Sequence, residues 1–215
     1  MKVTLEGVYK KLYSSFGPQD WWPGETPFEV MVGAILTQNT NWQNVEKAIA
    51  NLRAQKVLAA HTLYKLPHRR LASLIRPAGY FNIKAARLKE FVKFFLDFYR
   101  GNIRMMKHAA LPALRQQLLA VKGIGPETAD SILLYALGKP IFVVDAYTRR
   151  IFSRHRYIRE DYDYHQMQDF CMQRLEQKVQ LFNEFHALLV KLGKDFCLKS
   201  KPKCHICPLR GVKEA

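Results

Sequence analysis

The chain of 215 residues contains 34 Lys and Arg against 18 Asp and Glu, which gives a formal net charge of +16. This excess and the 12% of aromatic residues favour nucleic acid as a polyanionic partner, with a membrane surface or a ribosomal role as alternatives. No apolar run approaches the ~20 residues that a membrane span needs, so no membrane segment is expected. Three of the four cysteines fall within residues 197–207, which is not a disulfide framework. A cytoplasmic, nucleoid-associated protein is therefore expected.

Helical patterns dominate from the N-terminus onward. Residues 1–17 are amphipathic and lack the unbroken apolar core of a signal peptide. The segment Thr26-Pro27-Phe28-Glu29 is typical of a capping box, and it begins the apolar run 30–36. Another helix is predicted over residues 42–53.

A long helix is predicted over residues 83–99, with Asn82 as its cap. Its phenylalanines recur at helical spacing and predict a core stripe of Phe91, Phe94, Phe95 and Phe98. The strand-like run 140–144 is too short and isolated to form a sheet. Further helices are predicted at 111–121, 127–138, 146–155, 164–177 and 180–194. An all-α fold follows, with a domain boundary near residue 139.

The most informative pattern lies in residues 114–145. An apolar run ends at Lys122-Gly123-Ile124-Gly125, and a second helical run begins at Pro126. The glycines allow a tight turn, and proline suits the first helical position. Such a turn beside a helix N-terminus exposes N–H groups that can bind a phosphate. The pattern predicts a helix–hairpin–helix over about residues 114–137, followed by a single carboxylate, Asp145.

Three cysteines crowd into one loop near the C-terminus. Cys197, Cys204 and Cys207 are separated by six and two residues, and thiolates at this spacing can converge on one metal centre. His205 could complete a zinc site, although its position next to Cys204 would strain simultaneous ligation. A loop of reduced thiols is the alternative. Cys171 recurs at helical spacing with apolar residues and is interpreted as a core residue.

Four segments together resemble the endonuclease III branch of the helix–hairpin–helix DNA glycosylases. They occur in the order GAILTQNT (33–40), VKGIGPETAD (121–130), VVDAYTRR (143–150) and LGKDFCLKSKPKCHICPLR (192–210). The resemblance implies two α-helical domains flanking a DNA-binding cleft: residues 22–138 with the hairpin, and residues 1–21 with 139–215. It also implies a monomeric enzyme that flips a damaged nucleotide out of double-stranded DNA and cuts its N-glycosidic bond.

The resemblance assigns the chemistry to a carboxylate. Asp145 matches the essential aspartate of the family, which can stabilise positive charge on the sugar and orient or deprotonate the attacking water. The same residue is also a good helix N-cap. Glu127, which is also assigned to the base pocket, stands where bifunctional members have a lysine nucleophile. Since a carboxylate cannot form an imine, the resemblance implies a glycosylase without AP lyase activity. Lys122 is interpreted as a phosphate contact.

Aromatic and polar residues suggest how the base is held. Trp21, Trp22 and Trp42 resemble the pocket of endonuclease III-like 3-methyladenine DNA glycosylases, which clamps an alkylated purine between aromatic faces. Packing of the N-terminal helix is the alternative role of Trp21 and Trp22. Gln38 matches the residue that enters the gap left by the flipped base, and Tyr80 matches a second wedge position. Each of these two could instead be a cap or a loop anchor.

The cysteine loop resembles the four-iron four-sulfur ligand loop of the family, C-x6-C-x2-C-x5-C. Lys213 stands at the fourth cysteine position. A 4Fe–4S cluster held by three cysteines and a non-cysteine ligand or water is therefore one expectation, and loss of the site is the other. No nucleotide cofactor is expected.

Alkylated purines such as 3-methyladenine are the expected substrates. One alternative keeps the fold but has oxidised pyrimidines or mismatched bases as substrates. The other is a non-catalytic helix–hairpin–helix DNA-binding protein.

Overall fold

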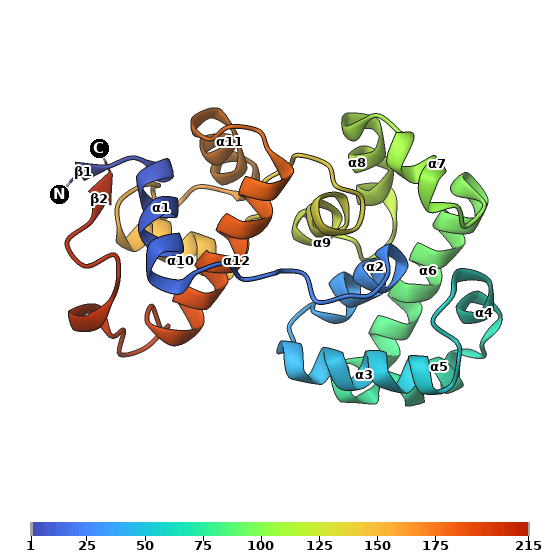
Figure 1. Ribbon diagram of the computed structural model, residues 1–215. Helices are drawn as coiled ribbons and strands as arrows, with labels where there is room; N and C mark the ends of the chain where they lie inside the picture. The colour runs from blue at the N-terminus through green and yellow to red at the C-terminus, as the bar shows by residue number, and fades with distance from the viewer. Residues whose placement is uncertain (1, 215) are drawn as a thin grey trace. The chain divides into compact units, whose positions relative to one another are not determined.

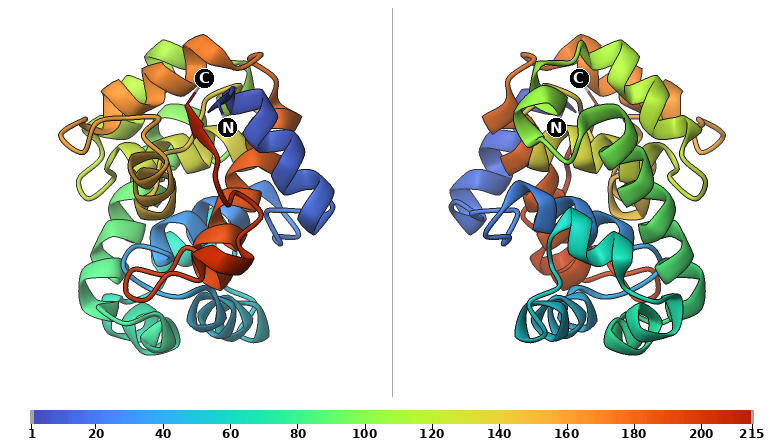
Figure 2. Two further views of the ribbon diagram at one scale, coloured as in Figure 1. Left: turned by 90° about the vertical axis from the view of Figure 1, so that its left-hand side faces the viewer. Right: turned by 90° about the vertical axis from the view of Figure 1, so that its right-hand side faces the viewer.

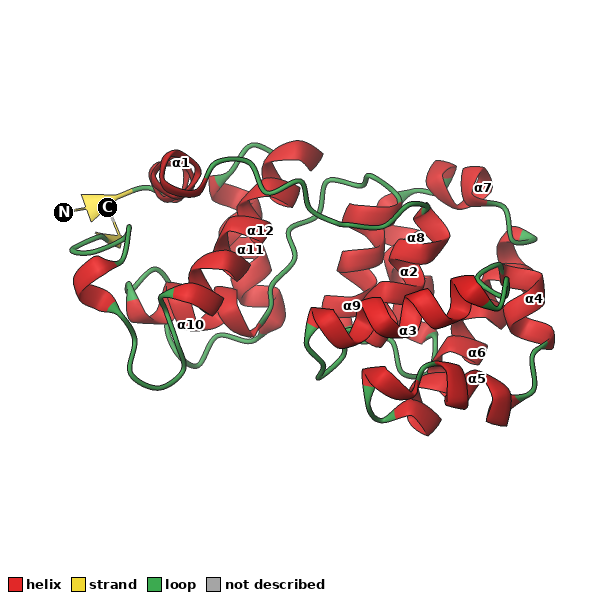
Figure 3. Cartoon of the chain, turned by 60° about the horizontal axis from the view of Figure 1, so that its bottom comes forward, coloured by secondary structure: helices red, strands yellow, loops and turns green. Residues whose placement is uncertain are grey.

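Helices make up nearly all the regular structure of the computed structural model, which describes residues 2–214 (Figure 1). The chain divides into two compact units. Unit 1 comprises Met1–Trp22 and Pro140–Ala215, and unit 2 comprises Pro23–Lys139. Strands are limited, among the described residues, to two segments of two residues each (Figure 3). The all-α prediction is therefore confirmed. No helix in the described part of the chain is both long and apolar enough to span a bilayer.

Unit 2 is built around α2 (Pro27–Leu36), in which every residue from Phe28 onward is buried. A helix that is apolar on every side must be covered on every side, and α2 packs against α3 (Trp42–Ala54) and α6 (Phe81–Tyr99). The remaining elements of unit 2 are, in chain order, α4 (Ala60–Lys65), α5 (His68–Leu74), η1 (Arg76–Ala78), α7 (Ile103–His108), α8 (Leu111–Ala120), α9 (Pro126–Ser131) and the π-helical η2 (Ile132–Ala136).

The predicted capping box at the start of α2 is only half present. The Thr26 hydroxyl accepts a hydrogen bond from the Glu29 N–H at 3.2 Å, as predicted. The Glu29 carboxylate, however, accepts hydrogen bonds from the Glu25 N–H and from the Arg53 guanidinium. A charged partner on α3 therefore takes the oxygen atoms that the reciprocal half of the box would use.

The long helix α6 differs from its prediction at both ends. It begins at Phe81 after Tyr80, which has a left-handed backbone, so Asn82 lies inside the helix and is not its cap. Phe98 was predicted to be in the core, but it is 62% exposed. In the last turn Tyr99 is buried instead, and its hydroxyl donates to the side chain of Gln117.

Three short helices, α4, α5 and α7, were not predicted, because six or seven residues are too few for a clear periodic pattern. The helix predicted over residues 127–138 is divided into α9 and the π-helical η2. The other predicted helices are confirmed to within a few residues at their ends.

Unit 1 contains α1 (Leu5–Phe16), α10 (Ala146–Arg154), α11 (Tyr164–Arg174) and α12 (Val179–Asp195). The long helix α12 packs against both α1 and α10 (Figure 1). The core of unit 1 contains a cluster of four aromatic rings, and the centroids of neighbouring rings lie 5.5 to 6.2 Å apart. The rings are those of Phe142, Phe152, Phe182 and Phe185.

The two ends of the chain meet in unit 1. The strand β1 (Lys2–Val3) pairs in parallel with β2 (Lys213–Glu214), and Lys2 lies opposite Lys213 (Figure 2). The run 140–144 forms no sheet, as predicted, and the Phe142 carbonyl accepts a hydrogen bond from Gln168 at 2.6 Å. Cys171 is confirmed as a core residue, and burial raises the pKa of its thiol.

Candidate functional site

The predicted hairpin connects α8 to α9 in unit 2. The side chains of Val121 and Ile124 are buried, whereas Lys122 and Gly125 are exposed. A backbone hydrogen bond of 3.0 Å from the Ile124 N–H to the Val121 carbonyl closes the turn. The two apolar side chains therefore anchor the turn, and the Lys122 side chain remains at the surface.

Glycine is required at position 123 for two reasons. Its φ of +90° lies in the region that favours glycine. In addition, a Cβ at this position would lie 2.4 Å from Cγ of Arg87 on α6. The hairpin and α6 thus approach each other closely at this residue.

A buried ion pair holds the two hairpin helices together. The Arg115 guanidinium on α8 donates to both oxygens of Asp130 on α9, at 2.7 and 3.0 Å. The Asp130 side chain is fully buried. This two-bond geometry fixes the angle between a guanidinium and a carboxylate, so it also restricts the relative orientation of the helices that carry them.

Gln38 lies against the hairpin. Its amide nitrogen donates to the Gly123 carbonyl and to the Thr128 hydroxyl, both at 3.0 Å. Its amide oxygen accepts a hydrogen bond from Arg87. The structure thus brings together two elements that the sequence predicted separately as DNA contacts.

Tyr80 is the most exposed large hydrophobic residue that the structure records, at 67%. It has a φ of 45° and precedes the first turn of α6. Its ring is therefore available to a partner. Its role as a wedge stays a prediction.

Asp145 lies at the N-terminus of α10 in unit 1, where its predicted role as N-cap is confirmed. Oδ1 accepts a hydrogen bond of 2.7 Å from the Thr148 N–H, and Oδ2 lies 3.6 Å from Nε2 of His186 on α12. Burial raises the pKa of Asp145, but the interactions with His186 and with Thr148 lower it, and the pKa lies below its ordinary value. The side chain is 11% exposed. The carboxylate is therefore ionised at neutral pH.

The sequence prediction missed His186. The residue is 6% exposed and is a single polar residue in the apolar stretch Phe185–Leu189. A histidine at such a position is the signal that could have found it, although a core role explains the same pattern.

The tryptophans predicted to form the base pocket belong to both units. Trp21 and Trp22, in unit 1, have ring centroids 5.2 Å apart, and the Lys194 ammonium lies 6.0 Å from the Trp21 ring. Trp42, in unit 2, is the first residue of α3, and its indole N–H donates to Glu46 at 2.7 Å. Glu127 is exposed in the first turn of α9. Their assignment to one pocket stays a prediction.

Arginines of α10 organise the cysteine loop. Arg150 donates to the carbonyls of Gly193 and Cys197, and Arg154 donates to those of Leu198 and Lys199. Four hydrogen bonds, counting one of 3.4 Å from Arg154 to the Cys197 sulfur, tie the loop to α10, and the bond from Arg150 to Gly193 ties α10 to the last turns of α12.

The three loop cysteines differ in environment. Cys197 is buried, Cys204 is exposed in the short helix η3 (Cys204–Ile206), and Cys207 is half-buried. Within residues 2–214, no group of three or more Cys, His, Asp or Glu side chains is arranged to hold a metal ion. Lys213, at the fourth position, lies in β2. The residues present therefore do not fit a four-ligand cluster in this geometry, and the cluster stays a prediction.

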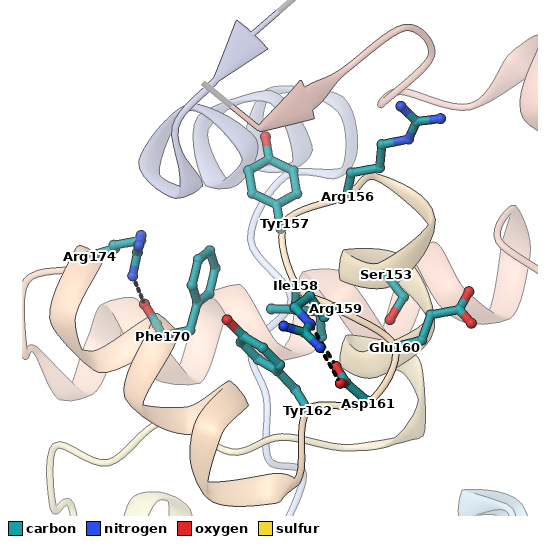
Figure 4. A pocket seen from close by; sticks show the side chains of 10 residues that line it. All are labelled: Ser153, Arg156, Tyr157, Ile158, Arg159, Glu160, Asp161, Tyr162, Phe170 and Arg174. Atoms are coloured by element: carbon teal, nitrogen blue, oxygen red, sulfur yellow. Dashed lines mark hydrogen bonds and ion pairs between the residues drawn. The ribbon is translucent and has the colours of Figure 1, made fainter.

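A cavity of about 590 Å³ lies beside the C-terminal end of α10 in unit 1 (Figure 4). Two of its arginines already have partners within the lining. Arg159 pairs with Asp161 at 2.6 Å, and the Arg174 guanidinium lies over the Phe170 ring. None of the residues predicted for the active site or the DNA contacts lines this cavity. It is therefore distinct from the predicted base pocket.

The family described as "HhH-GPD superfamily base excision DNA repair protein" matches residues 32–177, more than half of the chain. The chain belongs to this superfamily. The match includes the hairpin, Gln38 and Asp145. The prediction of a helix–hairpin–helix DNA glycosylase is thereby confirmed at the level of the family.

Individual relatives agree with this assignment. A protein of Methanocaldococcus jannaschii named "Putative DNA repair glycosylase MJ1434" is 46% identical over 94% of this chain and 92% of its own length. The crystal structure of H. pylori 3-methyladenine DNA glycosylase (MagIII) bound to 1,N6-ethenoadenine is similar at a TM-score of 0.77 and 29% identity, and the match covers 89% of this chain and 98% of that one. A non-covalent endonuclease III–DNA complex shares the fold at a TM-score of 0.81 and 22% identity, over 94% and 90% of the two chains.

Proposed function

We propose that this glycosylase is monofunctional and hydrolyses the N-glycosidic bond of alkylated purines in double-stranded DNA. The observation that carries the proposal is the Asp145 carboxylate, which is held at the start of α10 with a pKa below its ordinary value. Such a group is charged when a nucleotide with a cationic base enters the site.

Asp145 has two oxygens with different roles in the proposed reaction. Oδ1 accepts the Thr148 N–H, which fixes the orientation of the carboxylate. We assign Oδ2 to the attacking water. As the C1′–N bond breaks, the base leaves with the electron pair, and the negative charge of the carboxylate stabilises the positive charge that develops on the sugar. The water oxygen then bonds to C1′, and its proton passes to Asp145.

The proposal of alkylated purines rests on charge and on the aromatic residues. A purine nucleotide alkylated at ring nitrogen N3 or N7 carries a positive charge on the base, so the base attracts aromatic faces and leaves neutral without prior protonation. Trp21, Trp22 and Trp42 are the residues that we assign to this contact. The likeness to the H. pylori enzyme, which is named a 3-methyladenine DNA glycosylase, supports the same substrate class.

Glu127 supports the absence of lyase activity, because its carboxylate has no nucleophilic amine. Borohydride reduction during the reaction tests this point directly. We expect no covalent enzyme–DNA adduct, with a bifunctional endonuclease III as the positive control. A trapped adduct would contradict the monofunctional assignment, and Lys122 would be the first amine to replace.

The substrate class is tested by measuring base release from matched duplexes that contain one alkylated purine, one oxidised pyrimidine or one mismatched base. We expect the fastest release from the alkylated purine. Faster release from either of the other two would overturn the proposed substrate while leaving the glycosylase family intact.

The predicted iron–sulfur cluster has its own test, and no step above involves it. Iron and acid-labile sulfide are measured in protein purified without oxygen. Stoichiometric iron would establish a cluster with a non-cysteine ligand, and folded, iron-free protein would refute it.

A further inference from the structure

Lys84 is a buried cation that the proposed chemistry does not use. It lies on α6 and is 1% exposed. Its ammonium donates three hydrogen bonds: to the Leu36 carbonyl at 2.7 Å, to the Thr40 hydroxyl at 2.9 Å and to the Ala78 carbonyl at 2.8 Å. An ammonium has three donors, so every donor is satisfied.

The acceptors of Lys84 lie at two different connections of unit 2: Leu36 is the last residue of α2, Thr40 follows in the loop to α3, and Ala78 is the last residue of η1 before the turn into α6. Leu36 and Thr40 stand on either side of Gln38, and Ala78 stands two residues before Tyr80. The Thr40 hydroxyl also donates to the Ala78 carbonyl. Lys84 and Thr40 thus join the loop that carries Gln38 to the loop that carries Tyr80.

Burying a charged side chain costs free energy, because the charge loses its hydration. Well-packed apolar residues often replace buried ionic groups without loss of stability, so stability alone does not explain a lysine here. Burial lowers the pKa of Lys84 to about 8, helped by the nearby charge of Arg87. What the ammonium adds over an apolar side chain is directional bonding to three points on two loops.

We propose that Lys84 is a positioning residue that holds the Gln38 loop and the Tyr80 loop in one fixed arrangement, so that both side chains enter the DNA duplex together. The inference rests on the proposed glycosylase function and on the DNA roles that the family resemblance predicts for Gln38 and Tyr80. Lys84 itself is too buried to contact DNA.

Lys89 provides a matched control on the same helix. Its ammonium also donates to two backbone carbonyls, that of Tyr64 in the last turn of α4 and that of Leu66 just after this helix, and burial lowers its pKa. The loop that it holds connects α4 to α5 and contains no residue predicted to contact DNA. Lys84→Met and Lys89→Met therefore each remove one ammonium group of α6 that donates to backbone carbonyls. Only Lys84 bonds the Gln38 loop and the Tyr80 loop.

The experiment measures base flipping without base release. A duplex contains 2-aminopurine beside an abasic-site analogue, and stopped-flow fluorescence reports unstacking when the enzyme is added. We expect Lys84→Met to slow this step by about tenfold or more, since small misplacements at a site have effects of this size. Affinity for undamaged duplex should change by about twofold or less, because the hairpin remains. Lys89→Met should match the wild type in both measurements.

If Lys84→Met unstacks the base at the wild-type rate, the inference is wrong. It is also wrong if Lys89→Met slows unstacking as much as Lys84→Met does. If Lys84→Met does not fold, Thr40→Val removes one acceptor and the Thr40–Ala78 bond while the lysine remains. Slower flipping by Thr40→Val would support the inference, and wild-type flipping would refute it. Because the readout needs no bond cleavage, a wrong substrate class would leave this result interpretable.

Discussion

The two units hold their candidate functional groups in different ways. In unit 2, several hydrogen bonds connect the hairpin, the Gln38 loop and the Tyr80 loop. They are made by the side chains of Arg87, Gln38 and Lys84. In unit 1, Asp145 is held by one N-cap bond and by His186. A surface that must match the shape of DNA needs many fixed points, whereas a reacting carboxylate needs orientation and a pKa suited to its task.

Asp145→Asn tests the chemical side. We expect base release to fall by about a thousandfold or more, because the amide lacks the negative charge that stabilises the sugar. Duplex binding should survive, since the hairpin is in the other unit. Asp195→Asn, which changes an exposed aspartate of the same unit, is the control and should retain full activity. Unchanged release by Asp145→Asn would refute the mechanism.

Arg115→Met tests how much the buried ion pair stabilises the DNA-binding side. It leaves the Asp130 carboxylate buried without its guanidinium, which should lower the free energy of unfolding by about 3 to 5 kcal/mol. Urea denaturation measures this change. Arg159→Met, which removes an exposed pair with Asp161, is the matched control and should have little effect. Equal effects of the two changes would show that the hairpin does not depend on the buried pair.

The titration of Lys84 should make the stability of unit 2 depend on pH. Its pKa is about 8 in the folded protein against an ordinary value of 10.5, so between these values the unfolded state binds more protons. The free energy of unfolding should therefore rise with pH across this window, by up to about 3 kcal/mol relative to Lys84→Met. Denaturation of both proteins at a series of alkaline pH values measures the difference. Parallel pH dependences would contradict the lowered pKa of Lys84.

His186→Ala should change the pH dependence of base release and not its mechanism. Without the histidine, burial still raises the pKa of Asp145, and the largest lowering contribution is lost. The variant should lose activity at a higher pH than the wild type as the solution is acidified, while activity at neutral pH falls less than in Asp145→Asn. An unchanged acidic limb in single-turnover base release would show that His186 does not control the carboxylate.

Local patterns determined how much could be predicted. The helix over 42–53 and the turn at 122–125 follow from periodicity and from Gly and Pro preferences, which act within a few residues of sequence. Phe98 shows the limit of this reasoning. Its spacing fits the core stripe, but the neighbouring Tyr99 occupies the buried position in the last turn. The prediction of Asn82 as a cap was wrong for a similar reason. The helix begins at Phe81, directly after Tyr80 with its left-handed backbone, so Asn82 lies in the first turn.

The helical class, the hairpin and the N-cap position of Asp145 could be predicted from the amino-acid sequence, because each depends on neighbouring residues or on a short motif. Three contacts could not be predicted in this way: Gln38 bonds the hairpin, Lys84 joins two loops, and His186 faces Asp145. These contacts join residues far apart in the chain. Their existence depends on how whole helices pack, and a buried polar side chain finds its partners only when that packing is complete.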